Sequence, residues 1–393
     1  MTNQEIVSRG QEVVMNTYGR FPIALVKGKG SYVWDADGKE YLDFVGGIAV
    51  CALGHSPAEL QKIIKEQADN LWHVSNLYWI EPQVKLAEKL TGLSGLSQAF
   101  FCNSGAEANE AAIKLVRKYY YRQKENRSKI IVFNNSFHGR TLATLTATGQ
   151  SKYQEGFAPL PEGFVYADFN DLMSVEKLID EDTAAIMIEP IQGEGGVLPA
   201  DPAFLAGLRH ICNREGIFLV FDEVQCGVGR TGNFMAFQTY GISPDIVTMA
   251  KGLGGGFPIG AMLVNDKAAS GFAPGDHAST FGGNPLATAV ASQLVDIVSA
   301  PGFLENVNQM GGYLKQSLEQ IKDERIVAVR SKGLMAGLEF HKPVNDLVRI
   351  CMQNGLLLVG AGPQVLRFVP ALNVNETEIN QMVGLLKKSL KEW

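Results

Sequence analysis

Short, uninterrupted apolar runs alternate with helical segments through the middle of the chain. The runs that we expect to form strands are residues 98–102, 129–133, 184–188, 217–221 and 245–250. Ser104 and the pair Asp201-Pro202 precede the two clearest helical segments between these runs, as helix-opening residues do. Continuous apolar runs of this length are typical of strands buried on both faces of a mainly parallel sheet. The pattern therefore predicts an α/β domain whose sheet is covered by helices on both sides.

The pattern changes at both ends of the chain. Residues 29–44 predict a hairpin that turns at Asp37-Gly38, and Ser56 to Glu59 fit a capping box at the start of a helix. Beyond Asn284-Pro285 we expect helices near 303–321, 345–353 and 377–390, a hairpin through 331–333, and strands near 356–359 and 365–369. Such elements without regular alternation indicate a smaller α+β domain. We expect residues 56–290 to form the large domain and residues 291–393 the small domain, which residues 1–55 join.

The composition argues against several classes of protein, including nucleic-acid-binding, metal-binding and membrane proteins. A net charge of −6 over 393 residues argues against a nucleic-acid partner. The five cysteines include no CxxC pair and the six histidines no metal-binding motif, so we expect reduced cysteines and no metal site. No apolar stretch is long enough to span a bilayer, and the N-terminus lacks the pattern of a signal peptide. We therefore expect a cytoplasmic protein that is not bound to a membrane.

Polar and charged residues follow every one of the expected strands. They are residues 103–107, 134–140, 189–196, 222–225 and Lys251. Each taken alone has an ordinary explanation, such as a helix cap, a core aromatic or a surface ion pair. In an open parallel sheet, however, ligands bind outside the carboxyl ends of the strands, where these residues would meet. The coincidence favours a functional site at that edge of the sheet.

Lys251 is the most informative of these residues. The apolar run Ile246 to Ala250 leads it into a glycine-rich turn, where its charge is costly to desolvate and a ligand can approach the backbone closely. Catalysis by pyridoxal phosphate needs a lysine for the cofactor aldehyde, a carboxylate for the pyridine nitrogen, a helix N-terminus for the phosphate and an aromatic ring over the cofactor. Lys251, Asp222, Ser104 to Ala106 and Phe137 match these needs in turn. The strand ends therefore predict a pyridoxal-phosphate enzyme.

A nicotinamide-dependent oxidoreductase is the rival prediction. Residues Gly227 to Gly232 match the GxGxxG pattern and follow an expected strand. The glycines are not in the turn directly after the strand, however, and no acidic residue ends a second strand about twenty residues further on. We therefore prefer the pyridoxal-phosphate prediction.

Over nearly its whole length the chain resembles the class III aminotransferases, which are fold-type I pyridoxal-phosphate enzymes. The motifs that carry this resemblance are Asn103–Asn109, Ser136–Thr141, Glu189–Glu194, Asp222–Gly232, Ala250–Gly252 and Ser279–Pro285. Residues Tyr18–Pro22 and His73–Tyr78 are similar to those of the members that act on acylated ornithine. The resemblance implies a large domain with a mainly parallel seven-stranded sheet, a smaller α+β domain and a homodimer.

The resemblance also implies a role for individual residues. Lys251 would bind the cofactor aldehyde and move a proton, Asp222 would pair with the pyridine nitrogen, and Gln225 would lie near the phenolic oxygen. The remaining residues implied to bind the cofactor are Ser104, Gly105, Ala106, Phe137 and, from the partner subunit, Thr280. The residues implied to bind substrate are Tyr18, Arg140, Glu194, Ser279 and Arg367. Among these, Arg367 would bind a carboxylate of 2-oxoglutarate, and Glu194 would pair with it when the bound donor lacks that carboxylate.

The expected reaction moves the terminal amino group of N2-acetyl-ornithine to 2-oxoglutarate, a step of arginine biosynthesis. Two positions depart from related sequences. Cys51 stands where asparagine is frequent, with little expected effect, and Ile48 stands where ornithine δ-aminotransferases carry a tyrosine that contacts free ornithine. Ile48 cannot form a hydrogen bond with a free α-amino group, which favours an acylated donor. Succinyl-ornithine, succinyl-diaminopimelate, free ornithine and 4-aminobutyrate remain alternative donors, and a mutase on the same scaffold remains an alternative reaction.

Overall fold

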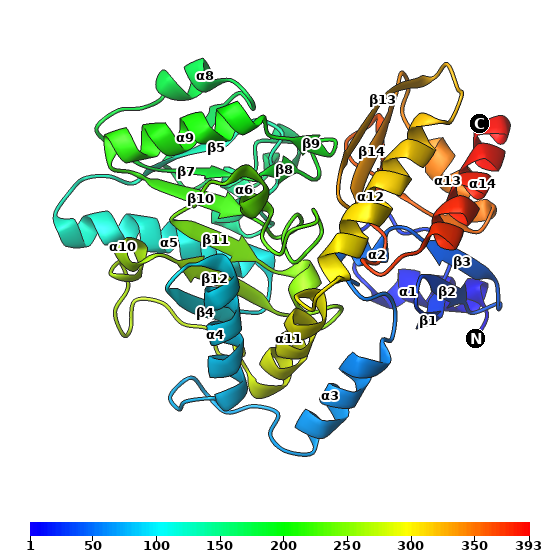
Figure 1. Cartoon of the computed structure of the whole chain (residues 1–393), viewed down its shortest axis with the longest axis horizontal. Coiled ribbons are helices and arrows are strands. Elements are labelled where there is room, and N and C mark those ends of the chain that lie inside the picture. Colours follow the sequence, from blue (N-terminus) through cyan, green and yellow to red (C-terminus); the bar gives the residue numbers. More distant parts are fainter.

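The computed structural model describes all 393 residues and divides into two lobes (Figure 1). The larger lobe contains a seven-stranded sheet, and the smaller lobe contains both chain termini. In spatial order the strands of the large sheet are β4 (Gln98–Cys102), β12 (Gly260–Val264), β11 (Ile246–Met249), β10 (Phe218–Asp222), β7 (Thr183–Ile188), β5 (Lys129–Phe133) and β6 (Phe164–Ala167). Only β12 runs antiparallel to its neighbours. The prediction of a mainly parallel, seven-stranded sheet is confirmed.

Alternate residues of this sheet face two separate cores, which explains why the strand sequences are apolar throughout. Every residue of β7 and β10 is buried. On one face, residues such as Val220 and Met187 pack against helix α5 (Gly105–Gln123). On the other face, residues such as Leu219 and Ile186 join the main core together with helix α9 (Pro202–Glu215). Burial on both faces removes the polar alternation that a half-exposed strand would show.

The remaining elements of the large lobe are short or lie around the sheet. They are α3 (Ala58–Ala68), α4 (Glu81–Ser94), α6 (Leu142–Ala147), α7 (Ser151–Gln154), α8 (Leu172–Glu176), β8 (Ile191–Gln192), β9 (Leu198–Pro199), η1 (Ala236–Tyr240), η2 (Lys251–Leu253), α10 (Asp266–Ala269) and α11 (Pro285–Val298). Helix α11 packs against α3 and α4. It opens at Asn284, whose side chain accepts the N–H of Ala287, as the Asn-Pro pair predicts.

The small lobe contains two four-stranded sheets. One consists of β13 (Ile326–Lys332), β14 (Met335–Phe340), β17 (Val365–Phe368) and β16 (Val359–Gly360). The other joins β1 (Leu25–Lys29), β2 (Tyr32–Asp35) and β3 (Glu40–Asp43) to β15 (Leu356–Leu357). The helices of this lobe are α1 (Asn3–Val13), α2 (Gly46–Ala49), α12 (Phe303–Glu319), α13 (Asn345–Gln353) and α14 (Glu376–Glu392). Because β15 completes the N-terminal sheet, we propose that residues 1–55 and 291–393 act as one domain, although α11 continues through residue 290.

Two local predictions were wrong. Ser56 does not cap helix α3, because the N-cap residue is Pro57 and Ser56 has a positive φ of 52°. The single strand expected near residues 356–359 is two strands that belong to different sheets. No single helix is long and apolar enough to cross a membrane; α11 and α12 reach that length only as a pair bent by 71°.

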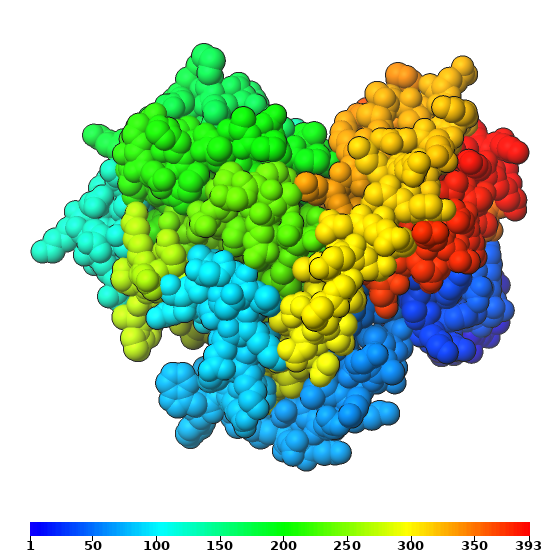
Figure 2. Space-filling model, in the orientation of Figure 1, coloured from blue at the N-terminus to red at the C-terminus, as the bar shows by residue number.

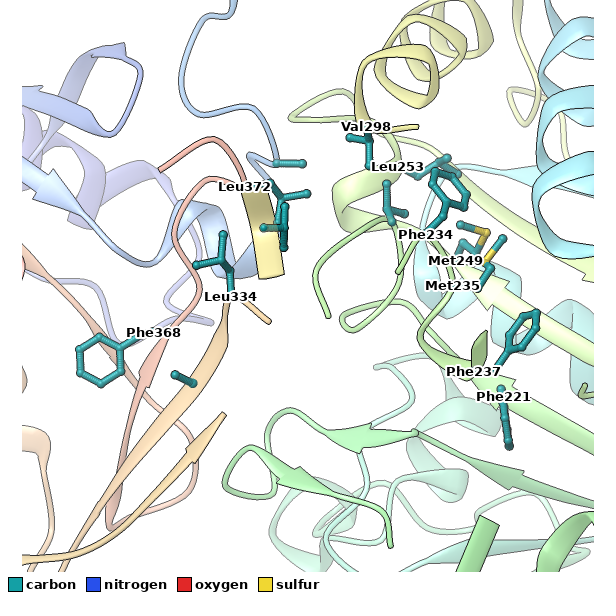
Figure 3. Close-up of a cluster of buried hydrophobic side chains, with 14 of the residues drawn as sticks. Phe221, Phe234, Met235, Phe237, Met249, Leu253, Val298, Leu334, Phe368 and Leu372 are labelled. Atoms are coloured by element: carbon teal, nitrogen blue, oxygen red, sulfur yellow. The ribbon is translucent and has the colours of Figure 1, made fainter. Parts of the chain in front are cut away.

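The main core is continuous between the lobes. Figure 3 shows Leu334 and Leu372 of the small lobe across from Phe234, Met249 and Leu253 of the large lobe, all members of one cluster of buried side chains. On the surface, a notch separates the green residues of the large lobe from the orange residues of the small lobe (Figure 2). The lobes are therefore joined through an apolar base and are open to solvent above it.

The glycines of the GxGxxG match lie at this junction between the lobes. A Cβ atom at Gly229 would come within 3.0 Å of Leu304, and one at Gly232 would overlap Asn308, both in helix α12. The side chain of Asn308 donates a hydrogen bond to the carbonyl of Gly232 (2.8 Å). These glycines therefore allow close packing of the turn on the small lobe, and the dinucleotide-binding alternative is not supported.

Candidate active site

A pocket of about 450 Å³ opens at the carboxyl ends of the central strands. Its walls include the following predicted residues: Ser104, Gly105, Ala106, Phe137, Arg140, Asp222, Gln225 and Lys251. They come from the ends of β4, β5, β10 and β11 and from the start of α5. The structure thus brings together, in one pocket, residues that are up to about 150 positions apart in the sequence, as the strand-end argument predicts.

Lys251 lies directly after β11, at the start of the short helix η2. Its φ of 40° is unusual for a residue with a side chain, and such strain is concentrated at functional positions. Burial, together with the positive charge of Arg367, lowers the pKa of Lys251, although nearby carboxylates, chiefly Glu194, oppose the shift. A lowered pKa increases the fraction of neutral amine, which is the nucleophilic form.

Asp222 is the last residue of β10 and is only 3% exposed. Its Oδ2 atom accepts hydrogen bonds from Asn109 Nδ2 (2.8 Å) and is 2.8 Å from His138 Nδ1. Its Oδ1 atom accepts the backbone N–H of Val224 (3.0 Å) and has capacity for one more donor. These hydrogen bonds hold the carboxylate in a fixed orientation at the pocket wall. Its Oδ1 atom keeps one acceptor position free.

His138 is fully buried behind Asp222. Burial disfavours its charged form, but the hydrogen bond and charge of Asp222 and the charge of Glu189 outweigh burial and raise the pKa of His138. A cationic His138 would stabilise the negative charge of Asp222, since the two side chains form an ion pair in that state. The sequence motif that contains His138 was recognised, but this role of the residue was not predicted.

The N-terminus of α5 forms the opposite end of the pocket. Ser104 is the N-cap residue, and its hydroxyl accepts the N–H of Glu107 (3.2 Å). The amides of Gly105 and Ala106 therefore stand in the first helical turn, where N–H groups have no partner within the helix. A Cβ atom at Gly105 would come within 2.7 Å of Val224, so glycine is required for the helix to begin this close to the pocket. Free amides and the helix dipole favour a phosphate at this position.

Phe137 and Arg140 line the pocket, and both contact a second aromatic ring, Tyr153, behind them. The ring of Phe137 packs edge-on against Tyr153, with 5.7 Å between the ring centroids. The guanidinium of Arg140 lies 4.2 Å from the centroid of the Tyr153 ring, and it is exposed at the pocket. Arg140 therefore stacks on an aromatic ring and keeps its hydrogen-bond donors for a ligand. Tyr153 was missed by the sequence analysis, because a tyrosine in a short helix between two loops gives no distinct signal.

Arg367 lies on β17 of the small lobe and is only 1% exposed. Its Nη1 atom donates to Glu194 Oε1 (2.6 Å) and to Gln225 Oε1 (3.1 Å), while its Nε atom is buried without a partner. Burial alone would raise the pKa of Glu194, but the charge and hydrogen bond of Arg367 outweigh burial and lower that pKa. This pair joins the two lobes beside the pocket, since Glu194 follows β8 of the large lobe.

Besides Glu194 and Arg367, which lie beside the pocket, three of the predicted residues do not line it in this chain. Tyr18 is 70% exposed, and its ring contacts Arg20. The Ser279 hydroxyl lies 3.2 Å from Asn103 Nδ2 and accepts the N–H of Gly282 (3.0 Å), and the neighbouring Thr280 is exposed. The substrate-binding roles of Tyr18 and Ser279 stay predictions, as does the contact of Thr280 with the phosphate of a partner subunit.

The pocket fits pyridoxal phosphate on three observations of this structure. Asp222 has a free acceptor position at the pocket wall, the first turn of α5 offers amides, and Lys251 has a lowered pKa. No cluster of side chains suited to a metal ion is present. The strand ends, the helix N-terminus and the lysine together define the site of a fold-type I pyridoxal-phosphate enzyme.

Comparison with known proteins gives the family. The family model described as aminotransferase class-III matches residues 13–390. The chain is 50% identical to an acetylornithine aminotransferase of Thermosynechococcus vestitus, over 96% of this chain and 95% of that protein. It is 49% identical to a succinylornithine transaminase of Photorhabdus laumondii, over 94% and 93% of the two chains. The chain therefore belongs to the class III aminotransferases, which depend on pyridoxal phosphate.

A solved structure agrees with this assignment. The ornithine aminotransferase of Toxoplasma gondii, crystallised with oxidised glutathione and with pyridoxal phosphate partially occupying its active site, superimposes with a TM-score of 0.94. The sequences are 30% identical, and the match covers 99% of this chain and 94% of that one. Both lobes therefore share the arrangement of a pyridoxal-phosphate aminotransferase.

Proposed function

We propose that this aminotransferase moves the terminal amino group of N2-acetyl-ornithine to 2-oxoglutarate, giving N-acetylglutamate 5-semialdehyde and glutamate. The observation that carries the proposal is the ion pair between the buried Arg367 and the partly buried Glu194, close to Lys251. When paired, Arg367 is neutralised and suits a donor whose reacting end has no carboxylate. When Glu194 moves away, Arg367 can bind one carboxylate of a dicarboxylic keto acid with bidentate geometry.

The proposed identity of the donor is based on Arg140 and Ile48. Arg140 presents an unpaired guanidinium above Tyr153, suited to the α-carboxylate of a substrate. Ile48, two residues before the pocket residue Val50, offers no polar atom to a free α-amino group. The acetylornithine and succinylornithine enzymes among the relatives act on donors of this acylated kind, as their names state. We propose the same donor class for this chain, with the role in arginine biosynthesis that follows from the acetyl donor.

The residues of the pocket divide the chemistry among them. Bound pyridoxal phosphate supplies an electron sink for the charge that remains when a C–H proton is removed from the carbon bearing the amino group. Lys251 has an amine whose lowered pKa suits it to take up that proton and return it. Asp222, held by Asn109 and His138, would stabilise positive charge on the ring nitrogen of the cofactor. Phe137, which lines the same pocket, would restrict motion of the cofactor ring.

Replacing Glu194 tests the proposed exchange between donor and acceptor. In Glu194→Gln, Arg367 keeps a hydrogen-bond partner but loses the charge that neutralises it, which leaves a buried cation unpaired. We expect kcat/KM for N2-acetyl-ornithine to fall about tenfold or more, while KM for 2-oxoglutarate stays the same or falls. Steady-state kinetics with each substrate varied separately give both values. An equal loss for both substrates would contradict the proposed role of Glu194.

A panel of donors tests the function itself. Initial rates are measured with N2-acetyl-ornithine, N2-succinyl-ornithine, free ornithine and 4-aminobutyrate, each with 2-oxoglutarate as acceptor. The proposal expects the two acylated donors to have the highest kcat/KM. A preference for free ornithine or 4-aminobutyrate would overturn the substrate and leave the family intact. Turnover without any keto acid would instead indicate a mutase.

We infer that the active form is a cytoplasmic homodimer in which Thr280 of the partner subunit reaches the phosphate. The inference is supported by large apolar side chains that are exposed in the single chain. Some lie near Tyr18 or Thr280 in sequence, and the others follow Asn76, whose side chain donates hydrogen bonds to the carbonyls of Ser279 and Gly282. The exposed side chains are Val13 (81% exposed), Met15 (80%), Leu77 (84%), Tyr78 (70%), Trp79 (92%) and Phe281 (62%). A monomeric protein rarely exposes so many such residues to water.

Mixed dimers test the contribution of Thr280 in trans. We co-express Lys251→Ala with Thr280→Ala chains that carry different affinity tags, and purify the hetero-dimer. One of its two sites then combines an intact lysine with an intact threonine from the other chain, so activity should rise toward half that of the unmodified dimer. Each variant purified alone serves as the control. A mixed dimer no more active than the Thr280→Ala homodimer would exclude the trans arrangement.

A further inference from the structure

Glu189 is a buried carboxylate to which neither the sequence motif nor the proposed chemistry gives a role. It directly follows β7, is 6% exposed and lines the cofactor pocket. One of its oxygens, Oε2, accepts the backbone N–H of Phe137 (3.0 Å). The other, Oε1, accepts the backbone N–H of Gly193 (3.4 Å). A single side chain thus contacts two loops that are more than fifty residues apart in the sequence.

The two loops carry the aromatic residue Phe137 and the carboxylate Glu194, which the proposed function expects to exchange partners. Phe137 belongs to the loop after β5 and forms the aromatic wall. Gly193 immediately precedes Glu194, whose carboxylate pairs with Arg367. A shift of Gly193 therefore displaces Glu194, and a shift of the Phe137 amide displaces the ring. Glu189 is the side chain that hydrogen-bonds to both backbones.

A charge at this position is costly, and the structure offers it no arginine or lysine partner. Burial is the largest effect on Glu189 and raises its pKa to about 7, although the nearby His138 charge opposes that shift. A glutamine of nearly the same size would avoid the cost of desolvating a charge. It has only one acceptor oxygen, however, and its NH₂ group would face one of the two N–H donors. A carboxylate is therefore needed at this position because it supplies two acceptor oxygens, one for the amide of Phe137 and one for the amide of Gly193.

We propose that Glu189 is a positioning residue that fixes the aromatic wall and the Glu194 turn relative to each other, and thereby sets the relative efficiency of the donor and acceptor half-reactions. The proposal rests on the proposed function of the Glu194–Arg367 pair. It adds that Glu189 keeps Glu194 in position to form this pair, by binding the amide of the neighbouring Gly193. With Glu189 in place, Glu194 lies 2.6 Å from Arg367 and neutralises it for the donor. Without the second hydrogen bond, the turn is freer, and the donor half-reaction loses more than the acceptor half-reaction.

The chain provides a matched control in Glu223. This carboxylate is 0% exposed and accepts two backbone N–H groups, those of Ala236 (2.6 Å) and Phe237 (2.7 Å). Burial raises its pKa to about 7, as it does for Glu189. Glu223 does not line the pocket. The variant Glu223→Gln therefore reports the structural cost of the same chemical change away from the two loops.

The experiment compares Glu189→Gln and Glu223→Gln with the unmodified protein. Amide hydrogen exchange is followed in the cofactor-free protein for peptides covering residues 134–140 and 190–197. Single-turnover rates are then measured for each half-reaction in the cofactor-bound protein, with the donor that works best on the unmodified enzyme. We expect faster exchange in at least one of the two segments, the one whose amide faces the new NH₂ group, and in Glu189→Gln only. We also expect the ratio of donor to acceptor kcat/KM to fall about fivefold or more in that variant and less than about twofold in Glu223→Gln.

Two outcomes would overturn the proposal. In one, exchange in the two segments stays unchanged in Glu189→Gln; in the other, both half-reactions slow by the same factor as in Glu223→Gln. If Glu189→Gln does not fold, Glu189→Asp replaces it, since its shorter side chain keeps the charge and cannot span both amides. Failure of N2-acetyl-ornithine as a donor would contradict the proposed function alone, because the ratio is measured with whichever donor is active.

Discussion

Replacing Lys251 with alanine is expected to abolish turnover, with a fall in kcat of more than about a thousandfold. The variant removes the amine that binds the cofactor aldehyde and also the base that moves the proton. No other lysine lines the pocket, so no neighbouring amine takes over either task. Product formation from donor and 2-oxoglutarate measures the loss, and circular dichroism verifies the fold. A small primary amine in the buffer should restore part of the rate, because it supplies a base without the side chain.

Lys267 provides the matched control for this prediction. It too has a pKa lowered by burial, and its ammonium lies 4.5 Å from the ring centroid of Phe218. It belongs to α10 and lies outside the pocket. Lys267→Ala should keep kcat within about a factor of three, because it removes only a packing contact and a hydrogen bond to the Gly216 carbonyl, both outside the pocket. If Lys251→Ala retains more than a small part of the normal rate, the proposed mechanism is wrong.

The second large effect is expected from Asp222→Asn. The substitution keeps the shape of the side chain but removes the negative charge that stabilises the protonated ring nitrogen. It also places an NH₂ group toward donors that now contact the carboxylate, such as Asn109 Nδ2. We expect kcat to fall about a hundredfold or more, with a smaller change in KM, because the charge acts mainly as the proton is removed. Steady-state kinetics separate the two constants.

Asp245→Asn is the control for the loss of a buried aspartate. Asp245 is 9% exposed and accepts hydrogen bonds from Arg209 (2.9 Å) and the backbone of Leu219 (2.8 Å), away from the pocket. This variant should lower thermal stability and leave kcat of the folded protein nearly unchanged. A similar kcat in Asp222→Asn and Asp245→Asn would contradict the role assigned to Asp222.

The sequence was sufficient to predict the central part of the fold and the pocket. Strands β7 and β10 are buried on both faces, so their apolar runs are uninterrupted and easy to recognise. Residues that follow parallel strands lie at the carboxyl edge of the sheet. The sequence therefore predicts that Asp222 and Lys251 lie close together. Strands β6 and β12 were not identified from the apolar runs. Strand β12 follows a glycine-rich turn and runs antiparallel to its neighbours, against the pattern of the other strands.

Long-range contacts set the limit of the sequence analysis. Nothing local indicates that Glu189 accepts the amides of Phe137 and Gly193, since the three positions meet only after folding. The same holds for the support that His138 gives to Asp222. The predicted role of Thr280 requires a second copy of the chain, and Tyr18 and Thr280 are both exposed in the single chain.

The most direct test is the visible spectrum of the purified, cofactor-bound protein, recorded while single amino donors are added without any keto acid. The account predicts that N2-acetyl-ornithine removes the absorbance of the lysine-bound cofactor, and that free ornithine does so only at far higher concentration. Loss of this absorbance at the lowest concentration with free ornithine or 4-aminobutyrate would contradict the proposed donor. A protein with no such absorbance, even after addition of pyridoxal phosphate, would contradict the site built around Lys251.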